Sequence, residues 1–565
     1  MRLFFLSLLF SVSSIVFAQN PLMIPGTLSG EDIDLVLQNG THEFFSGQLT
    51  NTMGANGDIL GPTIILDQGQ QVNFTVENQL GETTTVHWHG MHVAPENDGG
   101  PHTTIADGST WSPSFTVMDK ASTFWYHPHL HEHTDIHVSK GLAGLIIVRD
   151  DEEAALDLPR TYGVDDIPLV IQTKDFDSSG QILAHSNSDD VAMVNATIDP
   201  FHTVPAQVVR LRLLNGSSQR TFELGMDNGV LMHMIASDGG LLNAPVSLTR
   251  LRLSPGERAE VLVDLSAFEG QSVHLNSYAS ELPNGIYGAG VPGMMAMLTL
   301  DGYDPNNLNG TDFQLLELQV TAPSADPVTS IPAVLADFSP LLETDSDLSR
   351  ALTFTPTTPG PNQLNGDFLI NGAAFNMSTI NYEIPLGNTE IWTLTNQSGI
   401  SHPFHIHDVQ FFILSINGAP PPAHMQGLKD VVLVPQMGTV EFITVFEDFA
   451  NEDVPYMYHC HMLPHEDGGM MGQFIVVDQA NALDELANVE LQFYPNPAHD
   501  QISLVGNQSR QWNDIQIIDA SGRVIKSYSP NSGAISLNIS DLKKGLYTIR
   551  ATNDQESGDF KFIKK

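Results

Sequence analysis

Two distant parts of this chain share one spacing, and this repeat constrains the fold more than any other feature of the sequence. A glycine is followed nine residues later by an asparagine and eighteen residues later by a histidine, once as Gly69, Asn78 and His87 and once as Gly387, Asn396 and His405. In the first copy, residues 72–76 alternate apolar and polar side chains, which is typical of a half-buried β-strand. The chain therefore contains two homologous β-rich domains.

Each copy of the repeat supplies two His-x-His motifs. They are His87-Trp88-His89 and His127-Pro128-His129 in the first copy, and His405-Ile406-His407 and His459-Cys460-His461 in the second. Side chains at i and i+2 of a strand point to the same face, so each motif presents two imidazoles on one side. A single motif is better explained by solvated or core histidines. Eight imidazoles that converge where two domains meet suit a cluster of borderline-soft transition metals.

The second copy carries additional ligand types. Two histidines, one cysteine thiolate and a distant methionine form the ligand set of a blue-copper electron-transfer site, and the chain offers them as His402, Cys460, His465 and Met470. The first copy has other residues at three of these positions, namely Thr84, Pro128 and Leu142. This asymmetry predicts one mononuclear copper in the second copy and one trinuclear centre shared by both.

Short strands and turn signals recur along the chain, and they predict an all-β fold of sandwiches. The length of 565 residues is too great for one core. We expect domains at about 19–155, 156–320 and 321–482, and a small C-terminal β-sandwich at 488–565. The middle domain carries no His-x-His motif, but its strand at 208–215 matches the strand that leads to Asn78.

Residues 1–18 resemble a secretory signal peptide, with Arg2 before a short apolar run and a small-x-Ala site before Gln19. The alternative is a buried N-terminal strand. No later segment approaches the ~20 apolar residues of a transmembrane helix, so we expect an exported protein without a membrane span. The only cysteine is Cys460, which excludes an intrachain disulfide framework.

Four motifs resemble those of the multicopper oxidase family: His-Trp-His-Gly at 87–90, Trp-Tyr-His-Pro-His at 125–129, His-Pro-Phe-His-Ile-His at 402–407 and His-Cys-His-x3-His-x4-Met at 459–470. The resemblance spans about 40–480 and implies three cupredoxin-like domains with four copper ions. By this resemblance the type 1 ion falls on His402, Cys460, His465 and Met470, and the type 2 ion on His87 and His405. The type 3 pair falls on His89, His127 and His459 and on His129, His407 and His461.

The same resemblance assigns roles to two carboxylates. Asp98 matches an acid that holds water near the type 2 ion, and Glu466 matches a proton-delivery acid. Reduction of dioxygen to water consumes protons, so carboxylates beside a buried cluster make chemical sense. The alternatives are a turn residue before Gly99 and a solvated loop acid. Five further histidines form an extra metal site or, as we favour, lie in solvated loops: His92, His102, His131, His133 and His137.

The net charge of −43 disfavours nucleic acid as a partner. We expect a laccase-like oxidase that takes electrons from phenols or similar aromatics and passes them to dioxygen. The alternative is a metallo-oxidase of Cu(I), Fe(II) or Mn(II), which the acidic charge favours. Dedicated cuprous oxidases usually have an Asp and a Met where this chain has Ser398 and Ile400, and a Met-rich insert that is not found between about 330 and 400. A non-enzymatic copper-sequestering or electron-carrier protein is the third alternative, but a carrier needs only the type 1 set.

The last 75 or so residues carry different motifs from the rest of the chain. Their opening Tyr-Pro-Asn-Pro at 494–497, the Asp-x-x-Gly-Arg turn from Asp519 to Arg523 and the Gly-Leu-Tyr strand at 545–547 resemble the C-terminal sorting domain of type IX secretion cargo. This resemblance implies the secretion machinery as a partner and a location outside the cell or on its surface, reached through the periplasm. An ordinary appended sandwich is the alternative.

Overall fold

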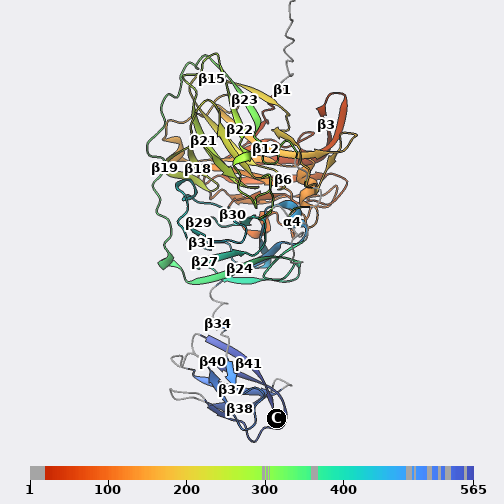
Figure 1. Ribbon diagram of the computed structural model, residues 1–565, viewed down its shortest axis with the longest axis vertical. Helices are drawn as coiled ribbons and strands as arrows, with labels where there is room; N and C mark the ends of the chain where they lie inside the picture. Colours follow the sequence, from red (N-terminus) through yellow and green to blue (C-terminus); the bar gives the residue numbers. More distant parts are fainter. Residues whose placement is uncertain are drawn as a thin grey trace, which may run out of the picture. The chain divides into compact units, whose positions relative to one another are not determined.

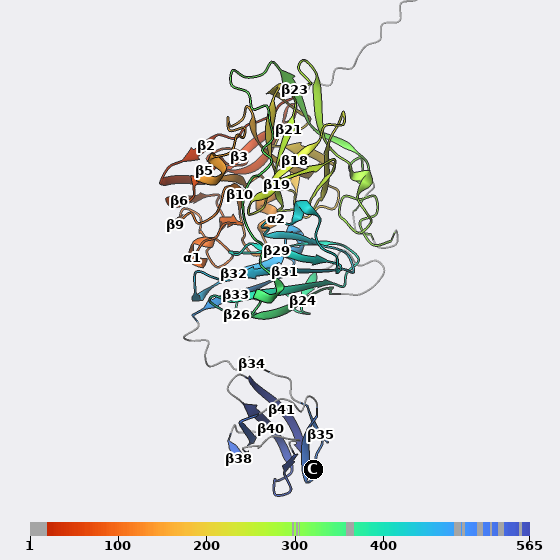
Figure 2. The same ribbon diagram turned by 90° about the vertical axis from the view of Figure 1, so that its left-hand side faces the viewer.

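The computed structural model describes residues 20–295, 299–300, 303, 306–357, 367–478, 487–488, 492–505, 512–519, 523–528, 536–552 and 556–565. The signal peptide expected at 1–18 lies outside these residues. Strand makes up 49% of the structure and helix 6%, which confirms the all-β prediction of three cupredoxin-like domains and a C-terminal β domain. The chain divides into two compact units, Met1–Val476 and Val477–Lys565. Figure 1 and Figure 2 show the sheets of each unit.

The first sandwich contains the N-terminal repeat. Its strands are β2 (Thr27–Ser29), β3 (Asp32–Phe45), β4 (Gln48–Ala55), β5 (Thr63–Asp67), β6 (Gln71–Gln79), β7 (His87–His89), β8 (Thr110–Trp111), β9 (Ser114–Thr116), β10 (Ser122–His127) and β11 (Gly144–Arg149). One sheet has the order β2-β5-β11-β10-β7, and the other has the order β4-β3-β6-β8 with β9 beside β6. In β6 every second residue is buried, as the alternation predicted.

The second sandwich has two larger sheets. Its strands are β1 (Asn20–Pro21), β12 (Asp166–Phe176), β13 (Ile182–Leu183), β14 (Val191–Val194), β15 (Pro200–Pro205), β16 (Val208–Asn215), β17 (Phe222–Met226), β18 (Met232–Ser237), β19 (Gly240–Leu248), β20 (Leu251–Leu253), β21 (Arg258–Asp264), β22 (Ser272–Ser277) and β23 (Phe313–Thr321). The orders are β1-β15-β23-β22-β17-β20 and β13-β12-β16-β21-β18-β19, with β14 beside β12. The first described strand, β1, thus joins the second sandwich.

The third sandwich repeats the plan of the first. Its strands are β24 (Leu348–Pro356), β25 (Phe368–Ile370), β26 (Tyr382–Pro385), β27 (Thr389–Asn396), β28 (His402–Ile406), β29 (Phe411–Ile416), β30 (Val431–Val434), β31 (Thr439–Val445), β32 (Asn451–Cys460) and β33 (Met471–Val477). The orders are β25-β24-β27-β31-β29 and β26-β33-β32-β28-β30. The sequence β33-β32-β28 matches β11-β10-β7, so the motif-bearing strands occupy the same places in both sandwiches.

Among the described residues, helices are few and short. They are α1 (Pro95–Asp98), α2 (Thr134–Ser139), α3 (Asp151–Ala154) and α4 (Leu463–Asp467), with 3-10 turns η1 (Ala279–Glu281), η2 (Glu343–Asp345) and η3 (Ala423–Met425). Helix α2 of the first sandwich packs on α4 of the third. Within the described chain, no helix has the length and apolar character needed to cross a membrane.

Equivalent asparagines mark the repeat in all three sandwiches. Asn78, Asn215 and Asn396 lie at the ends of β6, β16 and β27. Each accepts a hydrogen bond at Oδ1 from the N–H two residues further on, at 3.0, 3.0 and 2.8 Å. Each also donates from Nδ2 to two backbone carbonyls. The asparagine of the repeat therefore holds the turn after its strand, and the predicted match of 208–215 to the first repeat is confirmed.

The middle sandwich joins the other two through a buried arginine. Arg258, in β21, donates to the Thr123 carbonyl of the first sandwich at 3.1 Å. Its guanidinium also binds both carboxylate oxygens of Asp430 in the third sandwich, each at 2.6 Å. A bidentate pair of this kind fixes both distance and orientation, so the middle sandwich sets how the two motif-bearing sandwiches face each other.

The C-terminal unit has two sheets of its own. Its strands are β34 (Ala487–Asn488), β35 (Gln492–Tyr494), β36 (Gln501–Val505), β37 (Asp514–Asp519), β38 (Val524–Tyr528), β39 (Ser536–Asn538), β40 (Gly545–Thr552) and β41 (Glu556–Lys564). The orders are β34-β41-β40-β37-β38 and β35-β36-β39. The Arg523 N–H donates to Asp519 Oδ1 at 3.1 Å, and residues 520–522 of the predicted turn lie outside the described residues.

Candidate metal centre

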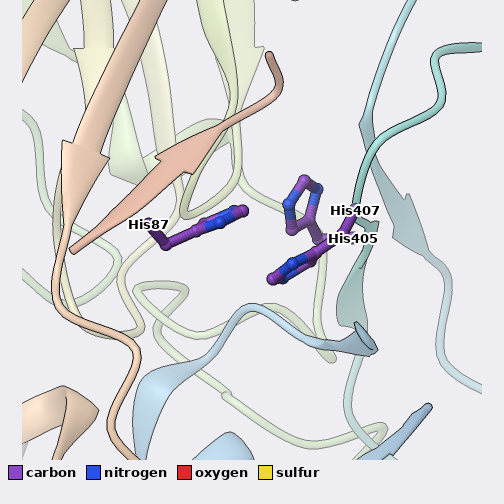
Figure 3. A group of neighbouring side chains, drawn as sticks. All are labelled: His87, His405 and His407. Atoms are coloured by element: carbon purple, nitrogen blue, oxygen red, sulfur yellow. The ribbon is translucent and has the colours of Figure 1, made fainter. Parts of the chain in front are cut away.

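The four His-x-His motifs lie on or next to paired strands whose register brings them together. In the first sandwich, β10 runs antiparallel to β7 and sets His127 opposite His87. In the third, β32 runs antiparallel to β28 and sets His459 opposite His405. Rings from the two sandwiches then stack, as His87 does on His407 with centroids 3.9 Å apart. Figure 3 shows His87 reaching from its strand toward His405 and His407 of the opposite sandwich.

His129, His407 and His459 form one group of ligands. Their Nε2 atoms lie 3.1, 3.2 and 3.4 Å apart. Burial lowers the pKa of His407 far below its ordinary value and that of His129 to about 3, so these rings are neutral. The Nδ1 atoms face Asp98 Oδ2, 2.8 Å from His407, and the Cys460 carbonyl, 3.1 Å from His459. With Nδ1 protonated, the Nε2 lone pairs face one another, an arrangement that repels unless a cation lies between them. The group therefore fits a copper ion.

His89, His127 and His461 form a second group. Nδ1 of His89 lies 3.3 Å from Nε2 of His127 and 3.2 Å from Nε2 of His461. Burial, followed by the charge of neighbouring histidines, lowers the pKa values of His89 and His127 well below the ordinary range. Burial also lowers the pKa of His461 to about 3. These neutral rings fit a second copper ion in the same way.

The sequence-based division of the type 3 ligands was wrong at two residues. We expected His459 to join His89 and His127, but it lies with His129 instead, and His461 takes its place. The two histidines join different groups because His459 is still paired within β32, whereas His461 lies one residue beyond the end of that strand. There its ring packs on Gly256 of the middle sandwich, where a Cβ atom would lie 2.9 Å from the ring.

His87 and His405 present one free nitrogen each. Nδ1 of His87 lies 3.0 Å from the Asp98 carbonyl, and Nδ1 of His405 lies 2.8 Å from the Asp430 carbonyl. Both Nε2 atoms are buried and have no hydrogen-bond partner within the described structure. A carbonyl on one nitrogen fixes the tautomer that leaves the other nitrogen free to bind a metal. The two residues, one from each repeat, fit the predicted type 2 position.

The two predicted carboxylates both lie against these groups. Asp98, at the end of α1, holds His407 as described, and Glu466, on α4, has Oε2 3.1 Å from His459 Nδ1 and Oε1 3.4 Å from His129 Nδ1. Each residue is only 1% exposed. Burial disfavours the charge of Glu466, but His129 and His459 outweigh it and hold the pKa of this carboxyl well below its ordinary value.

The predicted type 1 residues form a separate group. Cys460 Sγ lies 3.5 Å from Nδ1 of His402 and 3.7 Å from Nδ1 of His465, and the two Nδ1 atoms are 3.3 Å apart. Met470 is fully buried in the same core cluster as Cys460. Burial raises the pKa of the Cys460 thiol and lowers that of His465 to about 3. Two neutral imidazoles and a buried sulfur without a disulfide partner fit the blue-copper ligand set.

Comparison with known proteins agrees with this geometry. Multicopper oxidase models match residues 37–153, 167–275 and 343–480. The chain is 32% identical over 456 residues to the multicopper oxidase mco of Staphylococcus haemolyticus, which covers 79% of this chain and 88% of that protein. The chain belongs to the multicopper oxidase family. It is a copper-dependent oxidoreductase that uses dioxygen, and its histidine groups are consistent with type 1, type 2 and type 3 copper sites.

Two solved structures of multicopper oxidases are similar to this one. The laccase-like oxidase CueO of Ochrobactrum sp., described as active toward lignin model compounds and lignosulfonate, is 35% identical with a TM-score of 0.71; the match covers 81% of this chain and 100% of that one. A metallo-oxidase of Campylobacter jejuni is 26% identical with a TM-score of 0.67, over 82% of this chain and 96% of that one. A secretion system C-terminal sorting domain model matches residues 492–565, which indicates type IX secretion of this oxidase to the cell surface or beyond.

Sequence reasoning missed an acid that this oxidase holds between two cluster histidines. Asp430 Oδ1 lies 3.1 Å from His89 Nε2, and the Asp430 carbonyl faces His405 as described above. Arg258 neutralises the carboxylate. No motif marks Asp430, which stands alone before β30, and only the folded chain reveals its role.

Three of the five further histidines of this oxidase make ordinary protein contacts. His92 lies with Nε2 3.0 Å from Asp448, and His102 Nε2 lies 2.7 Å from the Gln473 side-chain oxygen. The His131 ring packs edge-on against Phe375. The hydrogen bonds of His92 and His102 explain these two residues without a metal. The remaining two, His133 and His137, lie next to Glu82. The prediction of a solvated loop was wrong for His137, because it lies in α2 with its side chain buried.

Proposed function

We propose that this oxidase takes single electrons from phenols or similar aromatic compounds and uses them to reduce dioxygen to water. In this proposal the ligands are His402, Cys460, His465 and Met470 for the type 1 ion, His87 and His405 for the type 2 ion, and His89, His127, His461 with His129, His407, His459 for the type 3 pair. When bound, copper supplies the one-electron chemistry that no side chain of this set provides.

The choice of an aromatic reductant rests on the side chains around His402 and His465. The Phe368 ring lies 4.6 Å from the His402 ring and 4.5 Å from the His465 ring. Nε2 of His402 contacts the neutral hydroxyl of Ser398. Among the contacts of the described residues, neither imidazole has a carboxylate partner. Phe368 is buried, so it makes the surroundings of the two imidazoles apolar and does not itself touch a donor, and such neutral surroundings suit an uncharged aromatic compound better than a cation. The similarity to a laccase-like oxidase supports the same choice.

The chain supplies a covalent path between the two kinds of site. Cys460 is bonded through the backbone to His459 and His461. These two histidines belong to different groups, His459 with His129 and His461 with His89. Electrons that leave the sulfur therefore reach both halves of the cluster through the backbone bonds on either side of Cys460.

Asp98 and Glu466 are proposed to relay protons to the cluster. Each is buried against the Nδ1 atom of at least one cluster histidine. Dioxygen reduction consumes protons at a site that water reaches poorly, so a resident carboxylate shortens the last transfer. The same contacts orient the imidazoles, and both roles are expected of each acid.

A metallo-oxidase is the second candidate, and two observations favour it. The chain has a net charge of −43, which attracts cations. Asp367 is exposed next to Phe368, and its Oδ1 lies 3.0 Å from where a Cβ atom on Gly468 would stand, three residues after His465. Such an acid is suited to hold a reducing cation near the type 1 ligands.

Oxygen uptake separates the two candidates. Copper-loaded protein is given a phenol, Cu(I), Fe(II) and Mn(II) in turn, and Asp367→Asn is assayed beside it. We expect the highest kcat/KM with the phenol and no effect of Asp367→Asn on that rate. A higher kcat/KM for one of the cations, reduced about tenfold by Asp367→Asn, would establish the metallo-oxidase instead.

A further inference from the structure

The first sandwich has its own version of the type 1 position. His137 lies seven residues before Gly144, as His465 lies seven residues before Gly472. Thr84, the counterpart of His402, has its hydroxyl 3.1 Å from Nδ1 of His137. The repeat has therefore lost its cysteine at Pro128 but kept a histidine in this place.

His137 is buried with one nitrogen that no protein group satisfies. Its side chain is fully buried, and its Nε2 has no hydrogen-bond partner in the described structure. Oε1 of the partly exposed Glu82 is 3.8 Å away, which is too long for a hydrogen bond. Burial lowers the pKa of His137 to about 4, so the ring is neutral. A buried polar nitrogen without a partner costs about 1–3 kcal/mol.

His133 completes a three-ligand arrangement. It is exposed at the start of α2, four residues before His137, and the His137 N–H donates to its carbonyl at 3.2 Å. Histidines at i and i+4 share a helix face, a spacing that suits binding of one metal ion. One atom each of Glu82, His133 and His137 lie within 4.8 Å of one another. The Glu82 backbone is fixed, because its carbonyl accepts from Asn78 at 2.8 Å.

We propose that Glu82, His133 and His137 form an additional site for a divalent borderline cation such as Zn2+, apart from the oxidase coppers. Two imidazoles and one carboxylate are a common zinc set, and metal–ligand distances of about 2.0–2.2 Å put two ligand atoms roughly 3.4 Å apart. The 3.8 Å between His137 Nε2 and Glu82 Oε1 is close to that value. The site has no sulfur ligand, so it is not a blue-copper site.

A bound ion would tie the segment after β6 to α2. Thr84 contacts His137, and the next residue, Thr85, accepts the backbone N–H of His129 at its hydroxyl at 2.6 Å. The site therefore steadies the segment that positions a cluster ligand, without touching the cluster itself.

The test is titration of the copper-loaded full-length protein with Zn2+. Calorimetry gives the affinity, and elemental analysis after gel filtration counts zinc and copper. The variants are Glu82→Gln and His133→Ala, both at solvent-accessible positions, with His274→Ala as the matched control. His274 is also accessible to solvent and lies 2.7 Å from a single carboxylate, that of Asp227.

We expect one equivalent of zinc with no loss of copper. Glu82→Gln and His133→Ala should each weaken binding at least about tenfold, whereas His274→Ala should leave it unchanged. Absence of binding, loss of copper as zinc enters, or equal affinity in all three variants would overturn the proposal.

Discussion

The hydroxyl oxygen of Ser398 lies 2.8 Å from Nε2 of His402, and both residues are buried. Ser398 is itself held, because its N–H and its hydroxyl both contact Asn396 Oδ1, at 2.8 Å each. With the serine oxygen accepting from Nε2–H, Nδ1 of His402 is left free toward Cys460. The asparagine of the repeat thus orients a type 1 ligand through one intervening serine.

Replacement of Ser398 by alanine should alter the type 1 potential. The change leaves a buried N–H without its acceptor, makes His402 a less basic ligand and disfavours Cu(II). We expect Ser398→Ala to stay blue and its potential to rise by roughly 60 mV per tenfold loss of Cu(II) preference. Redox titration of the visible band measures this. Ser398→Asp, which strengthens the acceptor, should shift the potential downward, and an upward shift in both variants would refute the relationship.

Replacement of Cys460 by serine should remove the blue colour. The buried sulfur faces Nδ1 of both His402 and His465, and thiolate-to-copper charge transfer requires it. We expect Cys460→Ser to lose the intense visible band and turnover while its circular dichroism stays that of the parent. His405→Ala is the control: it should stop dioxygen reduction and keep the colour. A blue Cys460→Ser protein would contradict the assignment.

Neutral substitutions should separate the two roles of the cluster carboxylates. Asp98→Asn and Glu466→Gln keep the size of each side chain, so each should retain the full copper content. We expect reoxidation of the reduced enzyme by dioxygen to slow roughly 100-fold, in line with loss of an acid–base group. Stopped-flow reduction of the blue band by substrate should be unchanged. If copper content falls instead, the acids act by positioning ligands alone.

Removal of the C-terminal unit should leave the chemistry intact. Each of the two units has its own sheets and its own core, and every proposed ligand precedes Val477. We expect a chain of residues 19–485 to bind its coppers and oxidise substrate at a near-parental rate. In the native host it should accumulate in the periplasm. Normal appearance of this shortened protein outside the cell would show that another signal directs its export.

Much of the fold could be predicted because both copies of the repeat keep the same intervals between their glycine, asparagine and histidine. The period-two alternation around Val72 and Phe74 predicted β6, and the interval from Asn78 to His87 predicted where the first ligand strand begins. Period two also explains why ligands alternate with core residues, since Trp88 and Ile406 lie in the cores of their sandwiches.

The division of ligands among ions was less predictable. His459 and His461 occupy equivalent places in their motif, and only the end of β32 and the close approach of Gly256 send them to different groups. No sequence pattern identifies Asp430, because its role depends on contacts with His89 and Arg258. Both residues are over 170 residues away in the chain. Long-range contacts of single residues leave no periodic signal.

The eight cluster histidines come in equal numbers from two sandwiches that are separate in the sequence. Neither sandwich alone completes either of the proposed type 3 sets, since His129 needs His407 and His89 needs His461. The free energy of copper binding is therefore also free energy for docking of the first sandwich on the third. Metal acquisition and closure of this interface form one equilibrium, so copper-starved cells would export a looser molecule, and proteases outside the cell would remove it first.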